Sequence, residues 1–164
     1  MLRHCCVFLL IAGVALGARA KEQVSPQVAI VARMYRDFAW EAVVVDPRPN
    51  EPTFMDQPRH VLARYLDPQL VRLVVADRAC VARRREICNL DFSPIWASQD
   101  PAATGLKVLP GIQSGTVDVL FIYPIDSKPI RLRYEIVDTQ SGPRIRDIHY
   151  ADGPSLLAIL RRKN

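Results

Sequence analysis

Residues 129–150 read PIRLRYEIVDTQSGPRIRDIHY, and this stretch decides the fold class. From 130 to 136 every second residue is apolar and the residues between them are charged. This period of two predicts a strand with one buried face. Ser141-Gly142 then marks a turn, and Arg144–Tyr150 predicts the returning strand. We therefore expect an antiparallel hairpin near the end of the chain.

Further strands are expected before this hairpin, and helices before those strands. The four expected strands are Thr104–Leu109, Gly115–Tyr123, Pro129–Asp138 and Arg144–Tyr150. Helices followed by a meander of strands are typical of an α+β domain. We expect N-terminal helices packed in a curved antiparallel sheet of about four strands, because alternation buries only one face of the sheet.

Two helices begin with the same signature, a capping side chain followed by proline. The first begins at Ser25-Pro26 and the second at Asp67-Pro68. Their expected apolar faces are Val28, Val31, Ala32, Tyr35 and Phe38 in the first, and Leu70, Leu73, Val74 and Val81 in the second. The second should end near Arg83-Arg84-Arg85, since cations are favoured at a helix C-terminus. The alternative interpretation of this run is a binding site for an anion or an acidic partner. Shorter helices are expected at Arg59–Tyr65 and Ser155–Lys163.

The N-terminus has the pattern of an export signal. A short positive region with Arg3 precedes the apolar run Cys5–Gly17, and Ala18-Arg19-Ala20 offers small residues for cleavage. The run is too short for a membrane anchor, which needs about 20 apolar residues. We therefore expect residues 1–20 to be a cleaved signal peptide and residues 21–164 to be a single domain. Cleavage lowers the formal net charge from +5 to +3 and leaves two of the 4 cysteines.

The two remaining cysteines, Cys80 and Cys88, are expected to form one disulfide, as is usual for a single pair in an exported protein. Two thiols without nearby histidines do not fill a tetrahedral zinc site. No metal site and no cofactor is therefore expected from the sequence.

Two segments show no regular pattern. Asp46–Pro58 holds four prolines, so it is expected to be a loop, either a solvated connector or a lid or binding loop. Asn89–Asp100 is expected to lie at the wide end of the sheet, with its aromatic residues in the core and its polar residues lining the opening. The candidate binding residues in this segment are Asp91, Trp96, Gln99 and Asp100.

Three stretches carry a resemblance to a known family: Arg64–Val74 (RYLDPQLVRLV), Leu90–Asp100 (LDFSPIWASQD) and Arg133–Leu160. They resemble a bacterial family catalogued as domain of unknown function 3828, whose fold resembles the cystatin-like, nuclear-transport-factor-2-like cone. The resemblance covers most of the chain after the signal peptide and departs at Pro143, where the family usually has an aromatic residue. It implies an exported domain with this cone fold, and it supplies no catalytic residues.

The hairpin holds one candidate catalytic cluster. If the turn lies at Gln140-Ser141, Tyr134 lies opposite Asp147 and Leu132 lies opposite His149, all on the same buried face. An aspartate beside a histidine sets its tautomer and raises its basicity, which is general-base chemistry. The alternative is a hydrogen-bonded buried network without catalysis, and no nucleophile, metal set or phosphate loop accompanies the cluster.

The opposite face of the hairpin is rich in arginine. The candidate binding residues there are Arg131, Arg133, Arg144 and Arg146. Glu135 is expected to pair with Arg146, which leaves three arginines without an acidic partner. Arginine among apolar residues is typical of interfaces, the alternative being an ordinary solvated face. The predicted export and the lack of an aromatic platform argue against nucleic acid. An acidic protein surface, an anionic envelope component or a second copy of the chain, docked through the sheet, is expected instead.

The sequence thus predicts a periplasmic or secreted binding protein that is not an enzyme. Its most specific form is an inhibitor or immunity-type protein that caps an envelope-acting effector through a protein contact. The alternatives are a cone domain that binds a small molecule or lipid, and a hydrolase or isomerase that uses Asp147 and His149.

Overall fold

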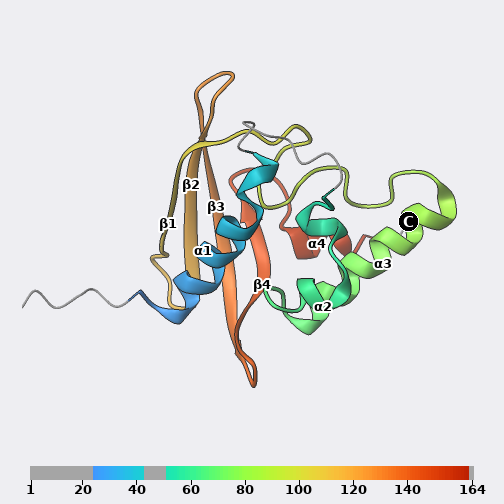
Figure 1. Ribbon diagram of the computed structural model, residues 1–164, viewed down its shortest axis with the longest axis horizontal. Helices are drawn as coiled ribbons and strands as arrows, with labels where there is room; N and C mark the ends of the chain where they lie inside the picture. The colour runs from blue at the N-terminus through green and yellow to red at the C-terminus, as the bar shows by residue number, and fades with distance from the viewer. Residues whose placement is uncertain (1–23, 43–50, 163–164) are drawn as a thin grey trace, which may run out of the picture.

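The computed structural model describes residues 24–42 and 51–162 of the chain. Its centre is one antiparallel sheet of four strands in the order β1-β2-β3-β4 (Figure 1). The strands are β1 (Thr104–Pro110), β2 (Thr116–Tyr123), β3 (Lys128–Thr139) and β4 (Gly142–Tyr150). The α+β class, with helices before a meander of strands, is confirmed.

The helices begin where the capping signatures predict. They are α1 (Pro26–Phe38), the 3₁₀ turns η1 (Ala39–Glu41) and η2 (Phe54–Asp56), α2 (Arg59–Leu62), α3 (Pro68–Arg84) and α4 (Leu156–Leu160). The Ser25 hydroxyl accepts a hydrogen bond from the Val28 N–H at 3.3 Å, and Asp67 Oδ1 accepts one from the Leu70 N–H at 2.7 Å. Each cap satisfies a donor that the helix itself leaves without a partner.

Aromatic rings fill the space between α1 and the sheet. Helix α1 lies across one face of the sheet, while α2 and α3 lie beyond its β4 edge (Figure 1). Tyr35 of α1 packs edge-to-face on Trp96 and Tyr134, with ring centroids 5.0 and 6.1 Å apart, and Trp96 packs on Phe121 at 5.5 Å. Side chains therefore fill the space between α1 and the sheet.

A β-bulge changes the predicted register of the β3–β4 hairpin. Near the turn the pairing is as expected, from Thr139↔Gly142 to Ile136↔Ile145. Arg146 is then an extra residue on β4, so that Glu135, rather than Tyr134, lies opposite Asp147. A bulge moves every residue beyond it by one position relative to the partner strand. The predicted pairs Tyr134–Asp147 and Leu132–His149 are therefore wrong.

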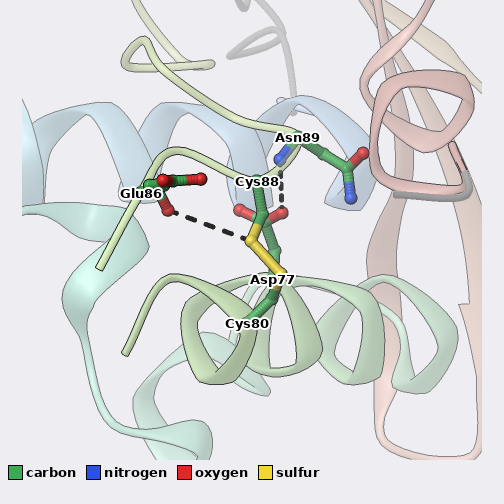
Figure 2. The surroundings of a disulfide bond; sticks show 5 residues. All are labelled: Asp77, Cys80, Glu86, Cys88 and Asn89. Atoms are coloured by element: carbon green, nitrogen blue, oxygen red, sulfur yellow. Dashed lines mark hydrogen bonds between the residues drawn. A yellow bond between two sulfur atoms is a disulfide. The ribbon is translucent and has the colours of Figure 1, made fainter. Parts of the chain in front are cut away.

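The disulfide between Cys80 and Cys88 is confirmed (Figure 2). The two Cα atoms are 6.2 Å apart, within the usual range for this bond. Beside it, Asp77 Oδ1 accepts a hydrogen bond from the Asn89 N–H at 2.9 Å. The disulfide and this hydrogen bond together hold the start of the irregular segment 89–100 against the C-terminal half of α3.

Several expectations concern residues outside the described ranges or need correction. The signal peptide at 1–20 and residues 46–50 of the proline-rich segment lie outside those ranges, while residues 54–56 of that segment form η2.

Val81 was expected in the core but is 37% exposed, and Asp77 holds the buried position on that part of α3. No helix in the described ranges has the length and hydropathy needed to cross a membrane.

Candidate functional site

A groove of about 590 Å³ runs between α3, the two 3₁₀ turns and the segment 89–101. We call it the α3 groove. Its apolar lining consists of Trp40, Met55, Val81, Leu90, Phe92 and Pro101. The exposure of Val81 follows from its place here. The disulfide links two sides of the groove, because Cys80 belongs to α3 and Cys88 precedes the segment on the other side.

Four carboxylates enter this apolar lining. They are Glu41, Asp56, Asp77 and Asp91. Each is held by uncharged donors: Asp56, for example, accepts from the Thr53 hydroxyl at 2.6 Å, and Asp91 accepts from the Gln99 amide at 3.1 Å. The cation of the lining, Arg78, donates instead to two backbone carbonyls at 2.7 and 3.0 Å. Within the described residues, none of the four carboxylates has an ion pair with a lysine or arginine.

Glu41 is the groove carboxylate with a perturbed acidity. It lies at the end of η1 and accepts hydrogen bonds from the Phe54 N–H and, at 3.1 Å, from the Ser93 hydroxyl. Burial raises the pKa of Glu41 and the nearby charge of Asp56 raises it further, while the two hydrogen bonds oppose the shift. Burial without a cation makes the charged form costly, which is a common property of binding sites.

The candidate binding residues of segment 89–100 have three different outcomes. Asp91 and Gln99 line the α3 groove, which no strand of the sheet lines, so their expected place at the wide end of the sheet stays a prediction. Asp100 is exposed beside it, and its backbone carbonyl accepts a hydrogen bond from the Ser98 hydroxyl at 2.9 Å. Trp96 is 2% exposed and packs in the core, so it is not a binding residue. Its burial agrees with the core position expected for the aromatic residues of this segment.

Sequence reasoning missed other residues of the groove. Trp40 and Glu41 directly follow the amphipathic pattern of α1, in a turn too short to have a period of its own. Met55 and Asp56 belong to the proline-rich segment, which was interpreted as a connector or a binding loop. The second interpretation rested on the length of the segment; the pair Phe54-Met55 is a further signal that could have favoured it, because adjacent large apolar residues are unusual in a solvated connector.

The sheet face turned away from α1 forms a second region, which we call the outer sheet face. It presents Asp118 and Leu120 of β2, Arg131, Arg133 and Glu135 of β3, and Asp147 and His149 of β4. A hollow of about 710 Å³ lies over it.

The predicted catalytic cluster does not form. Tyr134 is fully buried on the inner face, where its hydroxyl bonds to that of Tyr35 at 2.7 Å. Tyr35 in turn donates to the Ile95 carbonyl at 2.6 Å. Asp147 and His149 lie on the outer sheet face, because the bulge at Arg146 reverses their expected orientation. Tyr134 is therefore part of a hydrogen-bonded core network, and its side chain lies on the opposite face of the sheet from those of Asp147 and His149.

The candidate arginines are less free than expected. Buried Asp118 pairs with Arg131 at 2.7 Å and with Arg133 at 3.2 Å. Arg146 lies 3.7 Å from Glu135, which confirms that predicted pair. Arg144 instead donates to the backbone carbonyls of Ala63 and Pro143. The expectation of three arginines without acidic partners is therefore wrong, since Asp118 was not foreseen in the sheet face.

The acidity of Asp118 is also changed by this pairing. Burial acts to raise the pKa of Asp118, but the hydrogen bonds and charges of Arg131 and Arg133 outweigh it and lower the pKa. The two arginines and this carboxylate form one unit, and they are not independent anchors for an acidic partner.

No family model matches the chain. No curated protein matches it either. Among solved structures, it is similar to a phospholipid-binding protein from Ralstonia solanacearum, determined in complex with a phospholipid, at 11% sequence identity and a TM-score of 0.31. The similarity covers 82% of this chain and 76% of that one. A likeness at this TM-score supports no inference about the ligand.

Proposed function

We propose that the protein is a non-enzymatic binding protein that holds a small cationic amphiphile in the α3 groove. One observation carries this proposal: an apolar groove of about 590 Å³ whose four carboxylates have no ion pair with a described lysine or arginine. Ligand sites typically measure about 300–1,000 Å³ and combine apolar lining with a few polar groups.

The charges of the groove favour a cation as ligand. Glu41, Asp56, Asp77 and Asp91 outnumber Arg78, whose Nη1 donates to two backbone carbonyls. A cationic head group recovers part of the cost of burying Glu41, whereas an anionic head group adds repulsion. The apolar lining between α3 and segment 89–101 suits a hydrocarbon or ring body. These features together support an amphiphile with a positive head group.

The disulfide supports an extracytoplasmic location for this binding. Structural disulfides persist in oxidising compartments and are rare in the cytosol. Cleavage of residues 1–20 and export to the periplasm or medium remain predictions, as does membership of the family named above. Under this proposal the carrier or scavenger would meet its ligand in the envelope.

Calorimetric titration of the disulfide-bonded chain tests the proposal. The probes are decyltrimethylammonium and decyl sulfate, which share a chain length and differ in charge, both kept below micelle formation. We expect saturable 1:1 binding of the cation, weakened by Glu41→Gln and Asp91→Asn. Asp138→Asn, at an exposed carboxylate at the end of β3, is the matched control and should bind like the unmodified chain.

The opposite results have clear meanings. Equal binding of the two probes would show that charge does not select the ligand. Absence of saturable binding would remove the amphiphile proposal.

A second candidate function, capping of an envelope-acting effector, is favoured by the edge strand β1. The described residues place no partner strand on the outer edge of β1, and Leu106 and Leu109 are 37% and 43% exposed there. An exposed apolar edge can pair with an extended strand of another protein. Stoichiometric co-purification of an effector from the periplasm, lost in Leu109→Lys, supports this role. Retention of the effector by Leu109→Lys contradicts docking at this edge.

A further inference from the structure

The bulge in β4 brings three potential metal ligands together on the outer sheet face. His149 Nε2 lies 3.8 Å from Glu135 Oε2 and 3.8 Å from Asp147 Oδ2. One ligand atom from each of the three residues lies within 4.8 Å of the others. The sequence did not group these three residues, since the expected register without a bulge places Glu135 on the face opposite Asp147 and His149.

The separations suit a shared cation better than direct hydrogen bonds. A hydrogen bond between nitrogen and oxygen spans about 2.7–3.2 Å, so the 3.8 Å contacts of His149 are too long. Ligands at 2.0–2.2 Å from a tetrahedral zinc ion are separated by roughly 3.4 Å. Small rotations of Glu135 and His149, whose side chains are 41% and 48% exposed, close the difference.

Asp147 is fixed with one oxygen directed at this cluster. Its Oδ1 accepts hydrogen bonds from the Ile148 and Leu157 backbone N–H groups, both at 2.8 Å. The residue is 4% exposed, and its Oδ2 is the atom that faces His149. A buried carboxylate oriented through its other oxygen has the arrangement of a metal ligand with outer-shell support. This is an observation independent of the clustering itself.

We propose that Glu135, Asp147 and His149 bind a divalent first-row transition metal, of which Zn²⁺ is the best match. Imidazole nitrogen suits zinc and its neighbours, while magnesium and calcium prefer oxygen ligands alone. Three protein ligands leave one tetrahedral position, which faces the hollow lined by Glu135 and His149. Two carboxylates and a neutral imidazole balance the charge of the ion.

Arg146 competes with the metal for Glu135. Its Nη1 lies 3.7 Å from Glu135 Oε1, and its Nε lies 3.9 Å from Asp67. A cation beside a ligand carboxylate disfavours a second cation there, although exposure of the arginine weakens the effect. Removal of this charge should therefore tighten metal binding, whereas an unrelated surface change should not.

Zinc titration of the disulfide-bonded chain, purified without a histidine tag, tests the proposal. Isothermal calorimetry with Zn²⁺ alone should show one saturable site. His149→Gln and Glu135→Gln should each raise the Kd for zinc by about 10-fold to 100-fold, which is the usual loss of affinity when a metal site is perturbed. Arg146→Gln should lower the Kd several-fold. His60→Gln, at an exposed histidine of α2, should leave it unchanged.

Every outcome of this titration bears on the proposal. No saturable site, or equal zinc affinity in His149→Gln, overturns it. Weaker binding in Arg146→Gln also contradicts it, because the arginine would then support the site rather than compete with it. Circular dichroism confirms that each variant is folded, and Glu135→Gln and His149→Gln leave the backbone bonds of Asp147 in place. The site lies outside the α3 groove, so its failure leaves the proposed function untouched.

Discussion

The α3 groove and the outer sheet face both contain carboxylates, but the partners of these carboxylates differ. On the outer sheet face, Asp118 is shared by two arginines, and Glu135 lies beside Arg146. In the α3 groove, Glu41 and its three neighbouring carboxylates are held by uncharged donors, and Arg78 is bound to backbone carbonyls. The face that looks basic in sequence is thus largely neutralised, while the groove carboxylates have no ion pair with a lysine or arginine among residues 24–42 and 51–162.

The number of charged residues in a stretch of sequence is therefore a poor guide to its binding partners. Arginine is concentrated in the last hairpin, yet one aspartate on the neighbouring strand β2 forms ion pairs with two of these arginines. The groove acids come from four separate segments, so no charge run marks them in the sequence. The pKa shifts show the same contrast: the two arginines lower the pKa of Asp118, whereas burial raises the pKa of Glu41.

Removal of the disulfide should have the largest effect on stability, and of the two regions it should alter the α3 groove and leave the outer sheet face unchanged. Cys80→Ser with Cys88→Ser should lower the free energy of unfolding by about 2–3 kcal/mol, as expected for a short closed loop. It should also weaken amphiphile binding, because the two sides of the groove are no longer linked. Urea denaturation and calorimetry measure the two effects. Unchanged amphiphile affinity in the double variant would show that the disulfide does not shape the groove.

Asp118→Asn should destabilise the outer sheet face. The change leaves Arg131 and Arg133 without their shared carboxylate, and we expect a loss of about 1–2 kcal/mol, limited by the exposure of both arginines. Because the pKa of Asp118 is lowered in the folded state, its stabilisation is present above the ordinary value of 3.8 and is lost as the pH falls through the lowered pKa. Urea denaturation from pH 7 to pH 2 measures both effects. A variant with the acid sensitivity of the unmodified chain would show that this pairing is weak.

Tyr134→Phe should affect the core and neither of the two regions. Loss of the hydroxyl that bonds to Tyr35 should cost about 1 kcal/mol. Binding of the amphiphile and of zinc should stay unchanged, since Tyr134 lines neither region. A change in zinc affinity would indicate that Tyr134 contacts the Asp147 and His149 pair after all.

Glu41→Gln should have the smallest effect on stability and a clear effect on binding. Because burial raises the pKa of Glu41, the charged form is disfavoured in the folded protein, so the glutamine variant should be as stable as the unmodified chain or slightly more stable at neutral pH. Affinity for decyltrimethylammonium should fall as the pH is lowered through the raised pKa, and this dependence should flatten in the variant. Titrations from pH 8 down to the ordinary glutamate value of 4.5 measure it, with Asp91→Asn as comparison. A pH profile shared by Glu41→Gln and the unmodified chain would assign the charge preference to other carboxylates.

The helix starts and the strands were predictable because their signals are local. Ser25-Pro26 and Asp67-Pro68 set caps that depend on three or four residues, and the central part of β3 alternates strictly between apolar and charged residues. The α1 face also contains Ile30 and Met34, which the interpretation by spacing omitted. Elements defined by short-range chemistry are accessible from one sequence.

The candidate sites were less predictable because they depend on long-range placement. Nothing in Arg144–Tyr150 marks the bulge, and one extra residue there turns Asp147 and His149 toward Glu135. Asp91 and Gln99 were recognised, but Trp40, Glu41 and Met55 reach the groove only through the packing of separate segments. The Asp118 pairing likewise requires the β2–β3 register, which the composition of the hairpin does not contain.

The most direct test of the groove as a binding site is a nitrogen-15 NMR titration of the disulfide-bonded chain with decyltrimethylammonium. We expect changes in amide chemical shift concentrated at Arg78, Leu90 and Phe92, with the amide shifts of strands β2 and β3 unchanged. Shifts concentrated on Arg131 and Arg133, or no saturable shifts, would contradict it.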